Sequence, residues 1–115
     1  MTIDELAGRL GEVTILDVRS DGEYSGEAGY PCDPRQGHLP GARHLDLGRL
    51  SEARNVEEVR ELVGEPEGTE LVAYCHSGSR SQMAAQILTM AGYRARNYAG
   101  SWHEWSRRDD LPAES

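Results

Sequence analysis

One cysteine, Cys75, stands where its sulfur could act as a nucleophile. It follows Leu71 to Tyr74, a short apolar run of strand-forming residues, and a helical pattern begins at about Ser79 or Arg80. Unpaired N–H groups at a helix N-terminus, together with the helix dipole, stabilise an anion bound there. A thiolate is such an anion, so we expect the pKa of Cys75 to be lowered and its sulfur to be reactive at neutral pH.

The residues after Cys75 suit an anion-binding loop. Gly78 permits a backbone that curls with its amides inward, and Arg80 adds a cation with a planar fork of donors. Ser79 followed by Gln82 has the pattern of a capping box, which would start the helix. The alternative is a buried, inert cysteine, but the glycine, the arginine and the switch from strand to helix together favour a reactive one.

The spacing between Cys75 and Arg80 separates two kinds of chemistry. Cysteine-dependent phosphatases place five residues between the cysteine and the arginine, whereas this chain has four. A loop one residue shorter forms a smaller cradle, which suits a single sulfur atom on the cysteine better than a phosphate. The loop predicted to bind the substrate or a persulfide comprises His76, Ser77, Gly78, Ser79, Arg80 and Ser81.

Length, charge and hydropathy limit the kinds of protein that could carry this loop. With 115 residues we expect one domain, residues 1–115. The net charge of -8 argues against nucleic acid or an anionic membrane surface as the partner. No apolar run is long enough to span a membrane and residues 1–11 lack a signal-peptide pattern, so we expect a cytoplasmic protein with reduced cysteines.

The remaining elements alternate between strand and helix patterns. Such alternation predicts an α/β fold with a small parallel sheet and helices on both faces. The expected strands are Val13 to Val18, a short strand near Leu45, Leu71 to Tyr74, and Ala95 to Ala99. The expected helices are Thr2 to Gly11, a turn from Leu47 to Leu50, Val56 to Val63, the helix after Cys75, and a short helix capped by Ser101 and Glu104. Ser25 to Gln36 is predicted as a loop and Arg107 to Ser115 as a polar tail.

Charged residues at the end of the first strand are further candidates. Asp17, Arg19 and Glu23 would emerge at the carboxyl edge of the sheet, where ligands bind in open α/β sheets. They could be catalytic, but paired charges that fix a loop are the favoured interpretation. Trp102 and Trp105 are interpreted as packing residues rather than as a ligand cage.

The second cysteine and the histidines have weaker patterns. Cys32, His38, Cys75 and His76 lack the paired spacing of a zinc site, so no metal is predicted. Cys32 could be a resolving thiol, but a loop residue without catalytic duty is favoured. His38 lies in the turn Gly37 to Gly41, where a histidine more often bonds the backbone than acts as a general base.

Four motifs together resemble the rhodanese sulfurtransferases in their usual order. They are Leu-Asp-Val-Arg-Ser at 16–20 followed by Glu23 and Tyr24, Gly-His-Leu-Pro-Gly-Ala at 37–42, Cys-His-Ser-Gly-Ser-Arg-Ser at 75–81, and Gly-Ser-Trp-His-Glu-Trp at 100–105. The last motif and the insert ending at His38 look similar to the catalytic second half of tandem thiosulfate and mercaptopyruvate sulfurtransferases. The resemblance implies a five-stranded parallel sheet flanked by helices.

The resemblance also implies a reaction. In it, Cys75 takes a sulfane sulfur from thiosulfate, a small anionic donor, as a persulfide, and a thiol or cyanide accepts the sulfur; no cofactor is implied. Arg80 would bind the donor or brace the loop. Two departures bear on the donor: tandem enzymes usually carry an arginine where this chain has Glu23, and the loop matches neither their thiosulfate nor their mercaptopyruvate sequence.

Three alternative functions stay open on the sequence. A persulfide carrier that delivers sulfur to a partner protein would share Cys75. An arsenate or phosphate oxyanion enzyme is favoured by Arg80 and opposed by the short loop. A regulatory binding module would have an unreactive Cys75.

Overall fold

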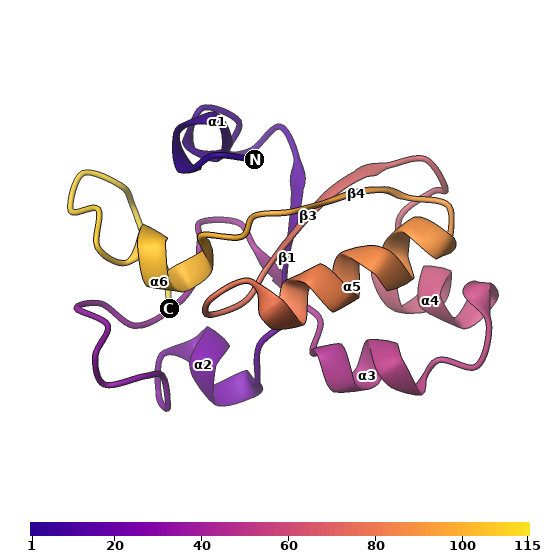
Figure 1. Cartoon of the computed structure of the whole chain (residues 1–115), viewed down its shortest axis with the longest axis horizontal. Coiled ribbons are helices and arrows are strands. Elements are labelled where there is room, and N and C mark those ends of the chain that lie inside the picture. The colour runs from indigo at the N-terminus through magenta and orange to yellow at the C-terminus, as the bar shows by residue number, and fades with distance from the viewer.

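The carboxyl ends of four parallel strands define the edge of the sheet at which the candidate residues gather. The computed structural model describes residues 1–115, and Figure 1 shows the sheet between two groups of helices. The strands run in the order β2-β1-β3-β4, and each neighbouring pair is parallel. Their bounds are β1 (Thr14–Asp17), β2 (Arg43–His44), β3 (Glu70–Tyr74) and β4 (Arg94–Asn97). The helices are α1 (Ile3–Ala7), α2 (Asp21–Ser25), α3 (Leu47–Glu52), α4 (Val56–Val63), α5 (Ser79–Met90) and α6 (Ser101–Trp105).

The central strand β3 explains the two layers of core. Successive side chains of a strand point to opposite faces, and here both faces are covered. Leu71 and Ala73 belong to the core cluster that includes residues of α3, α4 and α5. Val72 and Tyr74 belong to a second cluster, which includes residues of α1 and α6. The expected α/β architecture with helices on both faces is therefore confirmed.

The predicted number of strands is wrong, because the sheet has four strands and not five. The sequence pattern itself supplied four strands, and the fifth came from the family resemblance. Outside the named strands the only β-pairing is a single antiparallel bridge between His38 and Glu114. One bridge does not extend the ladder, so this segment adds no fifth strand.

Two helices differ from the predicted pattern. Helix α1 ends at Ala7, with Gly8 as its C-cap, instead of near Gly11, because the chain continues as turns in which the Arg9 N–H donates to the Leu6 carbonyl. Helix α2 was not predicted, since it lies in a polar stretch without apolar periodicity. It begins with a complete capping box between Ser20 and Glu23, as α1 does between Thr2 and Glu5.

The segment after α6 is docked rather than a loose polar tail, which corrects the prediction for Arg107 to Ser115. The guanidinium group of Arg35 donates to the backbone carbonyls of Trp105, Ser106, Arg108 and Leu111. The backbone of Glu114 also pairs with that of His38. The long loop between α2 and β2 is thereby fastened to the C-terminal segment.

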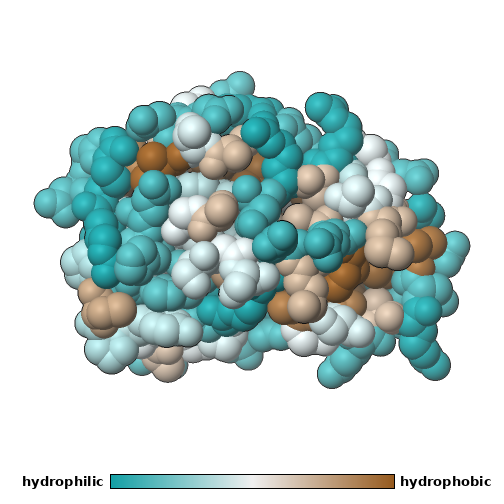
Figure 2. Space-filling view, in the orientation of Figure 1, coloured by the Kyte–Doolittle hydropathy of each residue, from teal (hydrophilic) through white to brown (hydrophobic).

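The molecular surface is polar over most of the face shown in Figure 2, with an apolar area where α3, α4 and α5 lie. A groove there is lined by side chains that include Leu50, Val56, Ile87 and Met90. Met90 is 80% exposed at its edge. None of the helices combines the length and the apolar character that crossing a bilayer requires.

Candidate active site

Cys75 is the first residue after β3 and is 1% exposed. The Gly78 N–H donates to its Sγ atom over 3.1 Å, and Ser81 Oγ lies 3.4 Å from the same sulfur. Ser81 Oγ also lies 2.6 Å from Asn97 Oδ1. The Gly78 carbonyl oxygen lies 3.3 Å from the same hydroxyl. A hydroxyl has one proton that can rotate to suit, so Ser81 can donate to any one of these three acceptors. The sulfur thus lies in a cradle made by the loop and by the first turn of α5.

The cradle favours the thiolate form of Cys75. Burial of the thiol raises its pKa, because the charged form loses contact with water. Hydrogen bonds from the Ser81 hydroxyl and from the N–H groups of Ser81, Gly78 and Ser77 outweigh this effect. The pKa of Cys75 therefore lies below its ordinary value, as a nucleophile at neutral pH requires.

Gly78 gives the loop its shape. Its φ of +100° lies in the left-handed region, and a Cβ atom built on it would come within 2.6 Å of the Ala99 carbonyl oxygen. Gly78 is also the N-cap of α5, and no side chain caps this helix. Helix α5 begins at Ser79, as predicted, but the predicted capping box of Ser79 and Gln82 is wrong, because Ser79 is the first residue of the helix and not its N-cap.

Helix α6 holds the backbone of Cys75 from the other side. Ser101 Oγ accepts the Cys75 N–H over 3.0 Å and donates to the Tyr98 carbonyl. The N–H groups of Trp102 and His103 donate to the carbonyls of Cys75 and His76. The prediction that Ser101 caps α6 is wrong, because Gly100 occupies the N-cap position without a side-chain bond. No local sequence pattern links Ser101 to Cys75, which lies 26 residues earlier.

Arg80 forms a two-point ion pair with Glu23 of α2. Its Nη1 and Nη2 atoms lie 2.8 and 3.0 Å from the two carboxylate oxygens. Burial alone would raise the pKa of Glu23, but hydrogen bonds from Arg80 and Ser20 and the charge of Arg80 lower it to about 2. The carboxylate in turn raises the pKa of Arg80. In this structure Arg80 joins the cysteine loop to α2, which is an arrangement suited to bracing.

Asp17, the last residue of β1, pairs with Arg19. Arg19 Nη2 is 2.7 Å from Asp17 Oδ2 and 2.5 Å from the Gly37 carbonyl oxygen. The Tyr74 hydroxyl donates to the same Asp17 oxygen over 2.7 Å. Both charged side chains are almost fully buried, and neither forms a hydrogen bond to Cys75. They hold the ends of β1 and β3 together, as expected of paired charges that fix a loop.

His76 connects the cysteine loop to the long loop before β2. Its Nε2 atom lies 2.9 Å from Asp33 Oδ2, and its ring stacks on Tyr30 with a centroid distance of 3.8 Å. Arg107 donates to the other oxygen of Asp33 over 2.9 Å. The side chain of Asp33 is fully buried between these partners. Asp33 had no signal in the sequence, because its partners lie on distant segments.

The four residues considered as zinc ligands do not form one group. Cys32 and His76 come near each other, with Asp33 as the third member, and their ligand atoms lie within 4.8 Å of one another. Asp33 already pairs with Arg107. His38 lies elsewhere, its Nδ1 atom 2.8 Å from the Tyr24 carbonyl oxygen and its ring stacked on Tyr24. This contact of His38 holds the turn from Gly37 to Gly41.

Trp102 and Trp105 are fully buried in the core, which confirms the interpretation that they are packing residues.

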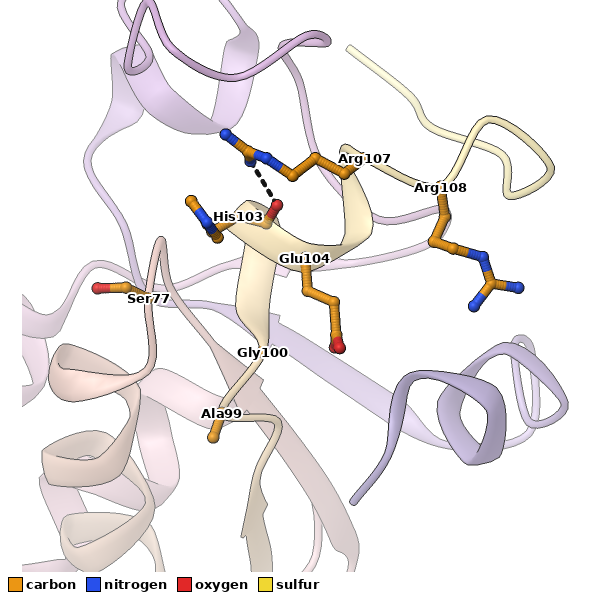
Figure 3. Close-up of a pocket in the computed structure, with 7 residues that line it drawn as sticks. All are labelled: Ser77, Ala99, Gly100, His103, Glu104, Arg107 and Arg108. Atoms are coloured by element: carbon orange, nitrogen blue, oxygen red, sulfur yellow. Dashed lines mark hydrogen bonds between the residues drawn. The ribbon is translucent and has the colours of Figure 1, made fainter.

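A cavity of about 510 Å³ lies beside the cysteine loop. Figure 3 shows Arg107 reaching over α6 to the His103 carbonyl, with Arg108 farther along the chain and the Glu104 side chain extending from the other side of the helix. Neither Cys75 nor Arg80 lines this cavity. Its lining residues are Ser77, Ala99, Gly100, His103, Glu104, Arg107 and Arg108.

Two relatives of this chain are named for the transfer or carriage of sulfur. The thiosulfate sulfurtransferase of Azotobacter vinelandii is 34% identical over 121 residues, which cover 96% of this chain and 44% of that relative. The sulfur carrier protein TtuD of Thermus thermophilus is 32% identical over 117 residues, which cover 89% of this chain and 41% of that protein. The chain thus spans less than half the length of these relatives.

A solved structure and a family profile also cover most of the chain. The crystal structure of a probable thiosulfate sulfurtransferase is 41% identical and superposes with a TM-score of 0.87, covering 100% of this chain and 47% of that one. A family profile described as a rhodanese-like domain matches residues 2–108. The cysteine loop lies within this match, and so do the strands and helices that position it. The chain therefore belongs to the rhodanese-like domain family.

Proposed function

We propose that this protein is a sulfurtransferase that moves a sulfane sulfur from thiosulfate to a thiophilic acceptor through a persulfide on Cys75. The observation that carries the proposal is the ring of donors around Cys75 Sγ, made by the Ser81 hydroxyl and the amides of the loop. The donors that stabilise a thiolate suit the negative terminal sulfur of a persulfide as well, by the logic of an oxyanion hole. The thiosulfate sulfurtransferases among the relatives support this choice of donor.

The first step is an attack by the Cys75 thiolate on the outer sulfur of thiosulfate. A bond forms between the two sulfurs, the sulfur–sulfur bond of thiosulfate breaks, and sulfite leaves with the bonding electron pair. Cys75 then carries a persulfide anion. The attacking thiolate has no proton to lose and sulfite leaves without one, so this step needs no general base.

The second step returns Cys75 to its thiolate form. The carbon of cyanide attacks the terminal sulfur, the persulfide bond breaks, and thiocyanate leaves. A thiol acceptor reacts in the same way as its thiolate and leaves as a persulfide. Neither step calls for a cofactor. We place the reaction in the cytoplasm, where the two free cysteines stay reduced.

A second candidate function is that of a persulfide carrier, which passes its sulfur to a partner protein. The relative named as a sulfur carrier protein favours it. Both functions share the loading of Cys75 and differ in the next step. A carrier would take up sulfur readily and turn over slowly with cyanide, whereas an enzyme would be fast in both steps.

An enzyme acting on arsenate or phosphate is the less supported reading. Such an enzyme needs a cation free to bind the oxyanion, and Arg80 is bound here to Glu23. This alternative would be supported if the wild type released phosphate from a generic aryl phosphate and the Cys75→Ser variant did not.

The experiment that tests the proposal is the intact mass of the reduced protein before and after thiosulfate. We expect the wild type to gain one sulfur atom, which cyanide then removes as thiocyanate. The Cys75→Ser variant should gain nothing, and a Cys32→Ser control should load like the wild type. Thiosulfate-dependent thiocyanate formation by Cys75→Ser would contradict the mechanism.

A further inference from the structure

Arg80, the cation of the cysteine loop, is paired with the carboxylate of Glu23. Arg80 lies within the loop, next to Ser81, whose hydroxyl is 3.4 Å from Cys75 Sγ. The negative charge of Cys75 also contributes to the raised pKa of Arg80. Both of its terminal nitrogens donate to Glu23. A parallel, two-point pair between arginine and a carboxylate is one of the stronger and more directional hydrogen-bonded arrangements in proteins.

Glu23 is itself held in place from three sides. The N–H and the hydroxyl of Ser20 bond its Oε1 atom, in addition to Arg80. Its side chain is 9% exposed, whereas that of Arg80 is 34% exposed. The carboxylate is therefore anchored to the start of α2, and any movement of Arg80 toward a ligand must break its bonds to a fixed partner.

Thiosulfate carries two negative charges, one of them on the group that leaves as sulfite. A free guanidinium beside the sulfur would attract that group. Arg80 and Glu23 together have no net charge, so the attraction is much reduced. A hydropersulfide of a small thiol reacts with a thiolate in its neutral form, whose terminal sulfur keeps its proton on transfer, so it presents no anionic group for a guanidinium to attract.

We propose that Glu23 sets the donor preference of the Cys75 site by holding Arg80 away from the anionic group of the donor. This inference rests on the proposed sulfur transfer. Thiosulfate remains a donor but is held weakly, and the favoured class is that of small hydropersulfides. In that case the Cys75 thiolate attacks the terminal sulfur, the persulfide bond of the donor breaks, and the donor leaves as a thiolate, while Cys75 keeps the transferred sulfur.

The test is the Glu23→Gln variant, which removes the charge and keeps the side-chain length. Glutamine also serves at this position of a capping box, so α2 retains its start. Sulfur loading of Cys75 is followed by intact mass against the concentration of thiosulfate and, separately, of benzyl hydropersulfide, whose organic group is uncharged. We expect the half-saturating thiosulfate concentration to fall about tenfold. The maximal loading rate and the values for benzyl hydropersulfide should stay within about twofold.

Two further variants separate a role through Arg80 from other effects. Glu27→Gln makes the same chemical change at an exposed position of the same segment and should behave like the wild type. The double variant Glu23→Gln with Arg80→Gln should lose the gain in thiosulfate affinity, because no cation remains to be freed. A gain that persists in the double variant would overturn the inference.

Sulfate, an anion that cannot donate sulfur to Cys75, tests the effect of Glu23 on anion binding separately from sulfur transfer. Sulfate should protect Cys75 from iodoacetamide at a lower concentration in Glu23→Gln than in the wild type. If sulfate protection and thiosulfate loading are both unchanged while Cys75 still loads, Glu23 only braces the loop and the inference fails. If neither donor loads Cys75 in the wild type, the proposed function fails, and the sulfate result still reports on Glu23.

Discussion

The proton on Ser81 Oγ decides how strongly the side chain of this residue supports the sulfur. Asn97 Oδ1, the Gly78 carbonyl oxygen and Cys75 Sγ compete for it, at 2.6, 3.3 and 3.4 Å. A thiolate is a stronger acceptor than a thiol, so ionisation of Cys75 attracts the proton toward the sulfur. The loop amides of Gly78 and Ser77 have no such choice and always point at the anion.

Removing this hydroxyl gives a prediction at the residue scale. In Ser81→Ala the pKa of Cys75 rises, because a hydrogen-bond donor to its charged form is lost while its burial is unchanged. The pH at which the rate of alkylation by iodoacetamide reaches half its maximum should therefore move upward, and the rate at pH 7 should fall severalfold. Ser51→Ala, an exposed change on α3, serves as the control. Identical profiles for both variants would contradict this role.

Asp17 gives a second prediction at this scale. In Asp17→Asn the shape is kept, but Arg19, which is 1% exposed, loses its counter-charge. Breaking a buried pair from one side costs about 3–5 kcal/mol of the free energy of unfolding. Urea unfolding measures this loss, with Asp21→Asn, whose side chain is 98% exposed, as the control. A loss below about 1 kcal/mol, typical of an exposed pair, would show that the buried pair is dispensable.

At the scale of elements, one ion pair joins α2 to the start of α5. Glu23 has a folded-state pKa of about 2 against an ordinary value of 4.5. A carboxyl group whose pKa is lowered by folding stabilises the protein above its ordinary pKa, and this contribution disappears as the pH falls through the folded value. The link between the two helices should therefore weaken between about pH 4.5 and about pH 2.

The prediction for this link compares melting temperatures of the wild type and Glu23→Gln. The wild type should melt at a higher temperature at pH 7, and the gap should narrow as the pH is lowered from 4.5 toward 2, since only the wild type loses a charge. Glu27→Gln should show no such narrowing. A gap that stays constant over this range would mean that the charge of Glu23 does not stabilise the link.

At the scale of the whole molecule, Arg35 fastens the C-terminal segment. Four backbone carbonyls accept from its guanidinium, and Trp105 of α6 lies beneath them, fully buried. Because α6 in turn bonds the backbone of Cys75, this one side chain connects the end of the chain to the candidate site.

Replacing Arg35 by alanine should release this segment. Loss of several charge-assisted hydrogen bonds should lower the free energy of unfolding by about 2–4 kcal/mol. Trypsin should then cut faster after Arg107 or Arg108, which limited proteolysis with mass detection would show. Arg54→Ala removes an arginine whose side chain is 87% exposed and should change neither result. Unchanged cleavage in Arg35→Ala would show that other contacts hold the segment.

The sequence predicts those parts of this molecule that are local. Cys75 and its loop are contiguous, so the switch from strand to helix and Gly78 reveal the cradle. Hydrophobic periodicity likewise finds the strands and the longer helices, because their core faces repeat along the chain. Hydrophobic periodicity does not detect helix α2, because its five residues are stabilised by a capping box and not by an apolar face.

Contacts between distant segments leave no such signal. The hydroxyl of Ser101 is used by Cys75 rather than by its own helix, and Asp33 reaches His76 across the fold. The charge of Glu23 is visible in the sequence, but its pairing with Arg80 depends on where α2 lies. The fifth strand was expected from resemblance alone, and no period in this chain supports it.

The backbone bonds from α6 to Cys75 have a consequence for protein synthesis. The ribosome makes Cys75 first, and Ser101 follows 26 residues later. A growing chain therefore carries this cysteine before the helix that clamps its backbone exists. Without that clamp we expect the loop amides not to be fixed around the sulfur and the thiol to keep its ordinary, weakly acidic character. A reactive thiolate would then form only once α6 has been made and has docked.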